Sequence, residues 1–445
     1  MKCIEDEIPF ELPDGWAWAR LSSIADMALG KMLDVAKNKG SLRPYLRNIN
    51  VRWGTFDLSD TLEMRFEDNE LERYSICYGD LVMCEGGEPG RCAVWKSEEV
   101  VFYQKALHRV RAIEILPEYL YYVIRRFIIS NQYEKYYTGT TIKHLTGQSL
   151  RMLPIPLPPL NEQKLIVEHL QRIIEEIDKI EMRKTEAFSL VSLAKSKILD
   201  LAIRGQLVPQ APADEPASVL LERIRAEKEE LIRQGKIKRD KKESVIFRGE
   251  DNSYYVRQDT HTESIDEQFI FELPDNWEWC SLLNIAKIEL GKTLDSAKNI
   301  GTNYPYLRSV NVRWNEVDLS DLKEMRFEPE ELDRYTVRRN DLLICEGGDV
   351  GRSCVWTDEK EILYQNALHR VRFYGGCNPF YFMYYMMYYE SRGIIKALCK
   401  GVTIKHLTGN VLSLIPFALP PIEEQGRIVE RLNRIFVLLD SIICD

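Results

Sequence analysis

The sequence lacks the features that mark a metalloprotein or a membrane protein. Its ten cysteines include no CxxC pair and no histidine spacing typical of zinc, and several lie in apolar, strand-like runs. No apolar run approaches the roughly eighteen residues that a membrane span needs. The first residues have neither the basic start nor the apolar stretch of a signal peptide. We therefore expect a cytoplasmic protein with reduced, mostly buried thiols and no metal.

Excess positive charge is also missing, since the 445 residues carry a formal net charge of −9. Proteins bind duplex DNA largely through Lys and Arg side chains that neutralise phosphates. The charge balance therefore argues against indiscriminate binding of nucleic acid. It leaves room for basic residues clustered on one face, or for a partner subunit that supplies most phosphate contacts.

Sequences that look like catalytic motifs are incomplete. Gly291-Lys292-Thr293 resembles the end of a Walker A loop, but Ala286 stands where the first glycine is required. The tetrad 378–381 (NPFY) resembles the NPPY tetrad of adenine methyltransferases, but it lacks the second proline, and we interpret it as the start of a helix. We expect no catalytic site and no cofactor.

Two copies of one domain are present. Residues 10–95 match residues 271–356 at a constant offset of 261, so that FELPDGWAW recurs as FELPDNWEW and PYLRNINVRW as PYLRSVNVRW. One inserted residue then shifts the offset to 262, after which TIKHLTG and the LPP element recur. A period this long indicates duplicated domains, because solenoid repeats run about 20 to 50 residues.

Each copy has the pattern of a mixed α+β domain. Residues 80–85 and 107–112 are short apolar runs bounded by polar residues, which predicts strands. Apolar residues at helical spacing follow Pro117, which predicts a helix over residues 117–137.

A long helix is predicted after each copy, because the LPP element ends a strand and a heptad pattern follows. In the first helix the pattern lasts about 40 residues, which predicts a coiled-coil rod about 60 Å long. A Gly- and Pro-containing loop (residues 204–218) and a charged amphipathic helix come next. The basic end of that helix, residues 236–242, fits a solvated helix terminus better than a nucleic-acid site. The heptad positions that we assign to the spacer and to subunit docking are Ile166, Leu170, Ile173, Ile177, Ile180, Ile428, Leu432, Ile435 and Leu439.

These elements predict an α+β protein in which two homologous domains are separated by long antiparallel coiled-coil helices, with pseudo-two-fold symmetry. The expected parts are a first recognition domain (1–156), a central helical spacer (157–247), a second recognition domain (248–418) and a shorter distal helix (419–445). Duplex DNA offers two-fold spacing for such an object to read. A bivalent adaptor that docks other proteins is the alternative.

The chain closely resembles the specificity subunit of Type I restriction-modification systems over essentially its whole length. The resemblance rests on the order of the domains, the LPPLNEQ and LPPIEEQ helix starts, the RGQLVPQ loop and the EPASVLLERIRAEKEELIRQGKIK helix, and residues 157–242 are its most specific part. It implies that each domain reads half of a split site in double-stranded DNA, and that the subunit itself is not catalytic. The implied partners are two modification subunits, which methylate adenine using S-adenosylmethionine and dock on the helices, and a motor-nuclease subunit.

The sequence departs from that family at two places. The first copy lacks the piece that precedes the second copy, and the last helix lacks a counterpart of residues 184–207. We expect the coiled coil to close over the five shared heptad positions, or a second chain to complete it.

Polar residues in three segments of each copy are candidates for DNA contact. Arg forks onto guanine and Asn onto adenine, while Lys, hydroxyl groups and backbone amides suit phosphates. The alternatives are that the arginines pair with carboxylates such as Asp57 and Asp60, and that the histidines are hydrogen-bonded turn residues. Because the copies share these residues almost one for one, we expect a near-palindromic split site. The candidates are Arg47, Asn48, Asn50, Arg52, Gly87, Arg91, Thr141, Lys143 and His144 in the first copy, and Arg308, Asn311, Arg313, Gly348, Arg352, Thr403, Lys405 and His406 in the second.

Overall fold

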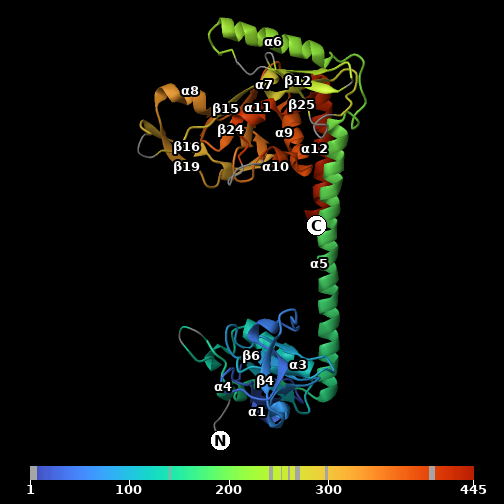
Figure 1. Cartoon of the computed structure of the whole chain (residues 1–445), viewed down its shortest axis with the longest axis vertical. Helices are drawn as coiled ribbons and strands as arrows, with labels where there is room; N and C mark the ends of the chain where they lie inside the picture. The colour runs from blue at the N-terminus through green and yellow to red at the C-terminus, as the bar shows by residue number, and fades with distance from the viewer. Residues whose placement is uncertain are drawn as a thin grey trace. The chain divides into compact units, whose positions relative to one another are not determined.

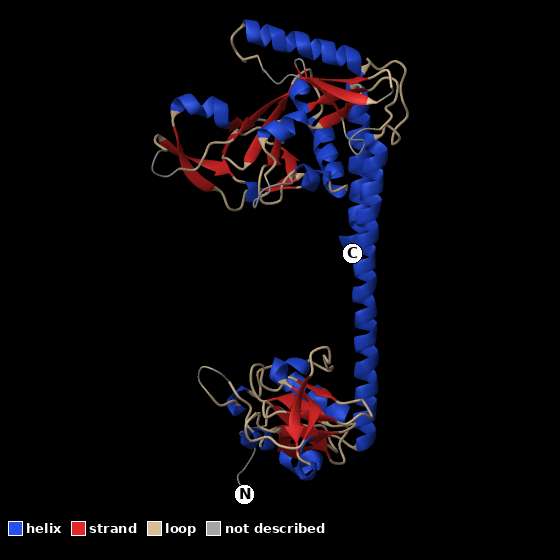
Figure 2. Ribbon diagram, viewed as in Figure 1, coloured by secondary structure: helices blue, strands red, loops and turns tan. Residues whose placement is uncertain are grey.

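The chain divides into two compact units, residues 1–181 (unit 1) and residues 182–445 (unit 2). The structure is a computed structural model, and it describes residues 8–139, 141, 143–239, 244–251, 253–258, 261–265, 271–295, 299–399 and 406–444. Figures 1 and 2 show that each unit combines strands with surrounding helices. The α+β class predicted from the sequence is confirmed.

Unit 1 contains two four-stranded sheets and a two-stranded one. The strand orders are β2-β9-β6-β7, β4-β3-β8-β5 and β1-β10. Neighbouring strands are antiparallel except β3 and β8, which run parallel. The elements are β1 Ala17–Arg20, α1 Leu21–Ile24, β2 Ala25–Leu29, β3 Ser41–Leu46, η2 Asn48–Asn50, β4 Leu62–Phe66, η3 Asp68–Glu70, α2 Leu71–Tyr74, β5 Ser75–Ile76, β6 Leu81–Cys84, β7 Cys92–Val94, β8 Val101–Tyr103, β9 Leu107–Ala112, α3 Pro117–Ile129, η4 Glu134–Tyr136, α4 Gly147–Arg151 and β10 Pro154–Leu157.

The strands predicted over residues 80–85 and 107–112 are β6 and β9. All four residues of β6 are buried, which explains why its sequence is continuously apolar. The helix predicted over residues 117–137 is shorter than expected. It ends at Ile129, because Asn131 adopts a left-handed conformation with a φ of 57° that breaks the helical path.

Unit 2 repeats this plan. Its strand orders β15-β24-β21-β22, β19-β16-β23-β20 and β14-β25 correspond to the three sheets of unit 1, and it adds the sheets β17-β18 and β11-β12-β13. Its elements are α6 Ala217–Arg233, β11 Ser244–Arg248, β12 Tyr254–Gln258, β13 His261–Ser264, β14 Glu278–Ser281, α7 Leu282–Ile285, β15 Ala286–Leu290, β16 Thr302–Leu307, η5 Ser309–Asn311, β17 Val312–Arg313, β18 Glu316–Val317, β19 Lys323–Phe327, η6 Pro329–Glu331, α8 Leu332–Tyr335, β20 Thr336–Val337, β21 Leu342–Cys345, β22 Ser353–Val355, β23 Ile362–Tyr364, β24 Leu368–Phe373, α9 Pro379–Ser391, α10 Ile394–Leu398, α11 Gly409–Leu414, β25 Pro416–Leu419 and α12 Ile422–Cys444.

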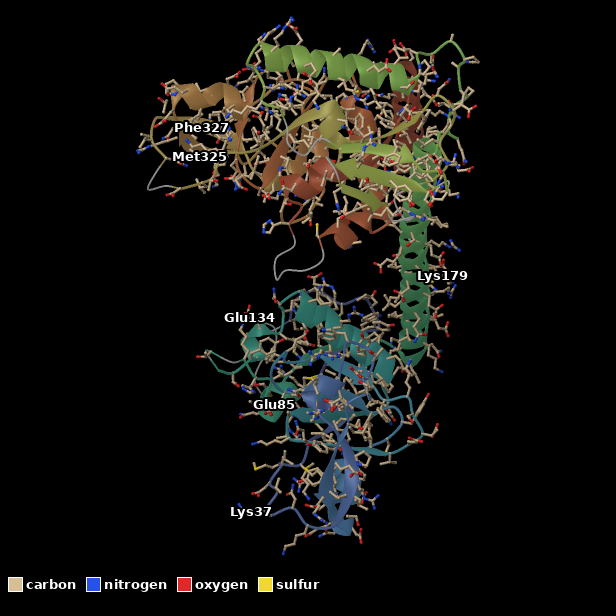
Figure 3. All side chains as sticks on the ribbon, turned by 45° about the horizontal axis from the view of Figure 1, so that its top comes forward. Lys37, Glu85, Glu134, Lys179, Met325 and Phe327 are labelled. Carbon is tan, nitrogen blue, oxygen red and sulfur yellow. The ribbon has the colours of Figure 1, made fainter. Side chains whose placement is uncertain are left out.

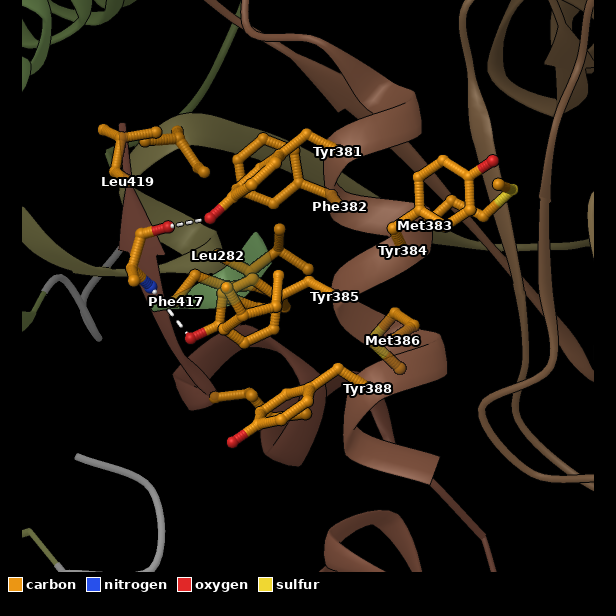
Figure 4. Packing of buried hydrophobic residues seen from close by; sticks show 14 of the residues in the cluster. Leu282, Tyr381, Phe382, Met383, Tyr384, Tyr385, Met386, Tyr388, Phe417 and Leu419 are labelled. Atoms are coloured by element: carbon orange, nitrogen blue, oxygen red, sulfur yellow. Dashed lines mark hydrogen bonds between the residues drawn. The ribbon is translucent and has the colours of Figure 1, made fainter. Parts of the chain in front are cut away.

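Helix α9 forms the centre of the unit 2 core. Its residues 379–389 are almost all apolar or tyrosine, and a helix that is apolar on all sides must be buried. Buried tyrosines are tolerated in this core because their hydroxyl groups are hydrogen-bonded, three of them to β25 and that of Tyr384 to Asn433 of α12. Tyr381 Oη donates to the Ala418 carbonyl at 2.8 Å, and Tyr385 Oη accepts from the Ala418 amide at 3.1 Å (Figure 4).

The long helix predicted after the first copy is α5, Leu160–Ile203, which has 44 residues. It begins directly after Pro158 and Pro159, which cannot continue the ladder of β10. It ends at Ile203, just before Gly205, whose φ of 69° suits glycine, and the Gln206 amide closes the helix end by donating to the Leu201 carbonyl at 2.8 Å.

Helix α12 packs within unit 2 against α9 and the last part of α5. Its heptad positions Ile428 and Leu432 are fully buried in the same cluster as Leu199 and Ile203 of α5. Lys195 of α5 also donates to Asp440 of α12 at 2.5 Å. The predicted contact between the two long helices is therefore confirmed for the second half of α5.

Among the described residues, no helix is long and apolar enough to cross a membrane, and no group of His, Cys, Asp and Glu could hold a metal. Cys77 is a half-buried free thiol, and the buried free thiols are Cys84, Cys92, Cys280, Cys345, Cys354, Cys377 and Cys399.

Candidate nucleic-acid interface

Three segments that are distant in the sequence meet at one edge of unit 1. They are the turn after β3 (residues 47–53), the glycine loop after β6 (residues 85–91) and the segment 138–145. Asn48 Nδ2 donates to the Gly86 carbonyl at 2.9 Å, which joins the first segment to the second. Gly86 also forms a bridge with His144, and the Leu145 amide donates to the Glu85 carbonyl at 2.7 Å, which joins the second to the third. The polar candidates therefore lie together.

The turn after β3 is held in shape by Asn50. This side chain is only 1% exposed. Its Oδ1 accepts from the Arg47 amide, and its Nδ2 donates to the carbonyls of Asp57 and Asp60, all at 2.9 Å. Because these bonds use both of its polar atoms, Asn50 shapes the turn and offers none of them to a ligand in this conformation. Of its neighbours, Arg52 is exposed, whereas Asn48 is half-buried and its Oδ1 is a buried atom without a hydrogen-bond partner.

The glycine loop approaches its neighbours too closely for side chains. A Cβ at Gly86 would lie 2.8 Å from the ring of His144, and Gly87 has a φ of 77°. Arg91, at the end of the loop, returns to the first segment, because its Nη2 donates to the Asn48 carbonyl at 2.9 Å. The loop thus connects Asn48, Arg91 and His144 through the backbone.

Each candidate cation of unit 1 has a carboxylate partner. Arg47 pairs with Asp60 at 2.7 Å, Arg91 with Glu88 at 2.7 Å and Arg52 with Asp57 at 3.6 Å. Lys143 pairs with Glu134, and the hydrogen bond from Lys143 lowers the pKa of that carboxyl group. Glu134 is labelled in Figure 3, as is Glu85, whose carbonyl accepts the hydrogen bond from the Leu145 amide. The alternative that the arginines pair with carboxylates such as Asp57 and Asp60 therefore describes this conformation.

Unit 2 repeats the geometry with small changes. Asn311 is buried and bonds to the Arg308 amide and to the Asp318 and Asp321 carbonyls. The hydrogen bond from Arg308 lowers the pKa of Asp321. Arg352 Nη2 donates to the Ser309 carbonyl at 2.9 Å, as Arg91 does to Asn48.

The remaining candidates of unit 2 are only partly covered by the structure. Arg313, Gly348 and His406 are described; Arg313 and His406 are exposed, and the ring of His406 lies beside Gly347. Thr403 and Lys405 lie outside the described residues. In unit 1 the corresponding Thr141 and Lys143 are exposed.

Sequence analysis missed one pair of exposed residues in the interface. Ile49 and Val310 are 50% and 52% exposed at the centre of their turns, between polar neighbours. Apolar side chains at such a place suit the methyl group of thymine. The available signal was an apolar residue inside a short 3-10 turn, where the alternation of a strand does not apply.

A second missed pair, His108 and His369, lies beneath the interface. Each is 1% exposed and bonds through Nε2 to a backbone carbonyl of the third segment, that of Leu145 at 2.9 Å and that of Leu407 at 2.8 Å. Burial lowers the pKa of both imidazoles. They support the third segment from the core.

The sequences that looked like catalytic motifs have structural roles. Lys292 is almost fully buried, pairs with Glu331 and stacks over the ring of Phe327. Asn378 caps α9, because its side chain accepts from the Phe380 amide, with Pro379 as the first helical residue. The interpretation of residues 378–381 as a helix start is confirmed.

The docking positions on α5 differ in exposure. Ile166 and Leu170 are half-buried, and Ile166 packs on the unit 1 core. Ile173, Ile177 and Ile180 are 56%, 48% and 61% exposed. Lys179, labelled in Figure 3, lies on the same stretch of α5. Exposed apolar residues in a row mark a surface that is suited to a partner.

Comparison with protein families gives one match that covers most of the chain. The model of the Type I restriction modification DNA specificity domain matches residues 13–187 and 274–442. The two matched ranges correspond to the two copies found in the sequence.

Curated relatives are similar across almost the whole chain. It is 24% identical to the Type I restriction enzyme EcoAI specificity subunit of Escherichia coli, over 97% of this chain and 79% of that protein. It is 23% identical to the EcoKI specificity subunit of Escherichia coli strain K12, over 97% of this chain and 84% of that protein.

Two solved structures share the fold. One, described as "Structural basis underlying complex assembly and conformational transition of the type I R-M system", has a TM-score of 0.66 at 20% identity, and covers 97% of this chain and 93% of that chain. The HsdS subunit from Thermoanaerobacter tengcongensis has a TM-score of 0.57 at 20% identity, and covers 98% and 93%.

Proposed function

Because this chain belongs to the Type I restriction-modification DNA specificity family, we propose that its two units read the two halves of one split, near-palindromic DNA site. The chain is a DNA specificity subunit with two target-recognition domains, and it belongs to a Type I restriction-modification complex. Such a subunit is non-catalytic. The family match favours DNA recognition over the adaptor alternative.

The observation that supports the proposed reading surface is the meeting of three polar segments in unit 1. Among the described residues of unit 2, Arg352 bonds to Ser309 and the Leu407 amide to the Glu346 carbonyl in the same way. We assign base contacts to Asn48, Ile49 and Arg52 in unit 1, and to Val310 and Arg313 in unit 2. Phosphate contacts are assigned to Thr141, Lys143 and His144, to their counterparts Thr403, Lys405 and His406, and to backbone amides at Gly87 and Gly348. Asn50 and Asn311 position the turn, and Arg47, Arg91, Arg308 and Arg352 both hold the loops and present charge.

The carboxylate partners suggest how the site avoids non-specific DNA. A cation that is already paired gains less by moving to a phosphate, because it gives up its carboxylate, which then lies unpaired near the DNA and is repelled by it. Only a duplex that also satisfies the base contacts compensates for this exchange. The net charge of −9 also weakens binding to non-specific DNA, because it repels the phosphates.

The proposed partners are double-stranded DNA, two modification subunits and, through the complex, the restriction subunit. The exposed apolar positions of α5, Ile173, Ile177 and Ile180, are the proposed docking surface for a modification subunit. Their spacing by three and four residues forms one stripe along the helix, as helix-on-helix packing requires.

Mapping the methylated sites tests the proposal. The chain is co-expressed with its modification subunit in a host without adenine methylation, and N6-methyladenine is mapped across the genome. We expect one split motif with two similar halves. Two unrelated halves would overturn the near-palindromic site, and a continuous motif would overturn the assignment of one half-site to each unit. If no base is methylated, selection of bound duplexes from a random pool by the purified complex decides whether the defect lies in reading DNA.

A further inference from the structure

A loop with an apolar tip leaves unit 1 at the sheet edge that carries the proposed interface. It joins β2 to β3 and comprises residues 31–39, which we call the apolar loop. Strand β2 ends at Leu29, which pairs with His108 of β9. Strand β6 ends at Cys84, which pairs with Leu107 of β9. The apolar loop and the glycine loop after β6 therefore leave the same edge of one sheet, on either side of β9.

The turn between β8 and β9 joins these two loops. The Lys105 amide donates to the Lys31 carbonyl at 2.8 Å. The Glu85 amide, at the start of the glycine loop, donates to the Ala106 carbonyl at 2.9 Å. Because strands in a sheet lie about 4.8 Å apart, two loops separated by one strand begin about 10 Å from each other. Glu85 and Lys37 are labelled along the same side of unit 1 in Figure 3.

Three apolar side chains of the apolar loop are exposed to solvent. The exposed fractions are 58% for Met32, 51% for Leu33 and 89% for Val35. Lys37 and Lys39 follow them and are exposed as well. Single exposed apolar residues are common on protein surfaces, but a cluster of them beside cations indicates a contact surface. Continuity with the proposed interface and the positive charge favour DNA as what this surface contacts.

The apolar loop is held in one conformation by polar contacts. At its base, Lys31 is 6% exposed, pairs with Glu70 and donates to the Arg65 carbonyl at 3.0 Å. On its far side, Asn38 Nδ2 donates to the Met32 carbonyl at 3.1 Å. A loop that is fixed before binding loses little conformational entropy when its side chains enter a groove.

Unit 2 presents the same apolar position. Its Asn299 side chain donates to the Thr293 carbonyl at 3.2 Å, which closes the equivalent loop. Leu294, the counterpart of Leu33, is 58% exposed. Leucine is therefore exposed at the same place in both units, whereas the polar Thr293 replaces Met32.

We propose that this leucine of each unit enters the minor groove beside the half-site, inserts between two base pairs and kinks the duplex there. This inference rests on the proposed function. The major groove is about 12 Å wide, so a duplex whose major groove receives the three polar segments presents its backbone and neighbouring minor groove about 10 Å away, at the apolar loop. Leu33 unstacks one base step, as the apolar side chains of minor-groove proteins do, and Lys37 and Lys39 contact the phosphates beside it.

Energy transfer across each half-site tests the proposal. The protein is the full chain in complex with its modification subunit, and the probe is a duplex with the split motif that this complex selects from a random pool. A donor and an acceptor dye flank one half-site or the other, and anisotropy verifies that the duplex is saturated. We expect Leu33→Ser to lower the energy transfer across one half only, because that half straightens, and Leu294→Ser to lower it across the other half only.

Ile113→Ser is the matched control. Ile113 is 54% exposed, but it follows β9 at the opposite edge of the sheet, where its amide donates to the Ile24 carbonyl. The control leaves the energy transfer across both halves unchanged, and thermal unfolding verifies that each variant folds. If a motif is selected but Leu33→Ser behaves like Ile113→Ser, or if it changes both halves equally, the inserted leucine is overturned and the proposed function stands. If no motif is selected, the proposed function fails, and this inference fails with it.

Discussion

Single residues set the balance between specific and non-specific DNA binding in the proposed interface. The ion pair of Lys143 with Glu134 lies on the surface, with both side chains more than half exposed. Pairs in such positions contribute little to stability, so they can be altered without unfolding the protein. Breaking such a pair has a larger effect on DNA binding, because each cation that is freed can contact a phosphate and release counterions from the duplex.

Lys143→Ala and Glu134→Gln are expected to change binding in opposite directions. Lys143→Ala weakens binding to all duplexes by a similar factor and reduces the slope of log affinity against log salt by about 1. Glu134→Gln frees the lysine and strengthens binding to random duplex. Filter binding or anisotropy at several salt concentrations measures both effects.

Lys179→Ala is the control for this pair, since Lys179 bonds to Glu176 on α5, away from the three segments. The assignment of Lys143 to phosphate would be wrong if the control changed the salt slope as much as Lys143→Ala does.

The buried histidines predict a pH-dependent stability. The pKa of His108 is lower in the folded protein than the usual value of about 6.5, because burial disfavours the charged ring. The unfolded chain therefore binds more protons below about pH 6.5, and the free energy of unfolding falls as the pH drops below that value. His108→Gln lowers stability at pH 7.5 but reduces its further loss at pH 5. Thermal unfolding at both pH values measures this difference, with the exposed His169→Gln as control; equal pH dependence in wild type and His108→Gln would contradict it.

At the scale of elements, the end of α5 depends on one glycine. Gly205 has a φ of 69°, and a Cβ there would lie 2.5 Å from Cγ of Pro274. The left-handed conformation alone costs a non-glycine residue about 1 kcal/mol, and the collision with a rigid proline ring adds to it. The turn that directs the chain from α5 toward Gln210 therefore requires glycine.

Gly205→Ala is expected to destabilise unit 2 by more than about 1 kcal/mol in the free energy of unfolding. Chemical denaturation measures this loss. Gly235→Ala is the matched control, because Gly235 has a similar φ of 70° but no atom within 4 Å of its Cβ position. If both variants lost the same stability, the contact with Pro274 would be irrelevant and only the backbone conformation would matter.

At the scale of the whole molecule, the two proposed interfaces are nearly identical. A single substitution could therefore make one unit read the half-site of the other. The turn after β3 differs at Asn48, where unit 2 has Ser309, although the neighbouring bonds of Asn50 and Asn311 are the same. A substitution that converts one residue into the other should leave the turn intact. It should then alter what that unit reads, although Asn48→Ser also removes the hydrogen bond from Asn48 to the Gly86 carbonyl.

Asn48→Ser is expected to shift one half of the methylated motif toward the other half, while the second half stays as it was. Ser309→Asn should produce the converse change. Mapping of N6-methyladenine with the modification subunit present measures both. A change in both halves, or in neither, would show that these residues do not read bases.

The sequence by itself determined the duplication, the α+β class and the positions of the long helices. These features follow from local patterns: a constant offset between copies, alternating or continuous apolar runs, and heptads after a Pro-Pro step. The end of α3 at Ile129 was missed because tyrosines continue the apolar pattern beyond it, although Asn131, a residue type that tolerates the left-handed conformation, was a local signal.

Only the tertiary structure decided which polar residues face outward and which surface stays open. Asn48 and Asn50 belong to the same short turn, yet one lies at the edge of the glycine loop and the other is buried by carbonyls from ten residues away. Likewise Trp16 and Trp277 stand in almost identical sequences, and Trp277 alone is part of a core, because residues 199–224 pack into the same cluster. Burial depends on neighbours that are brought near by folding, and a local pattern carries no information about them.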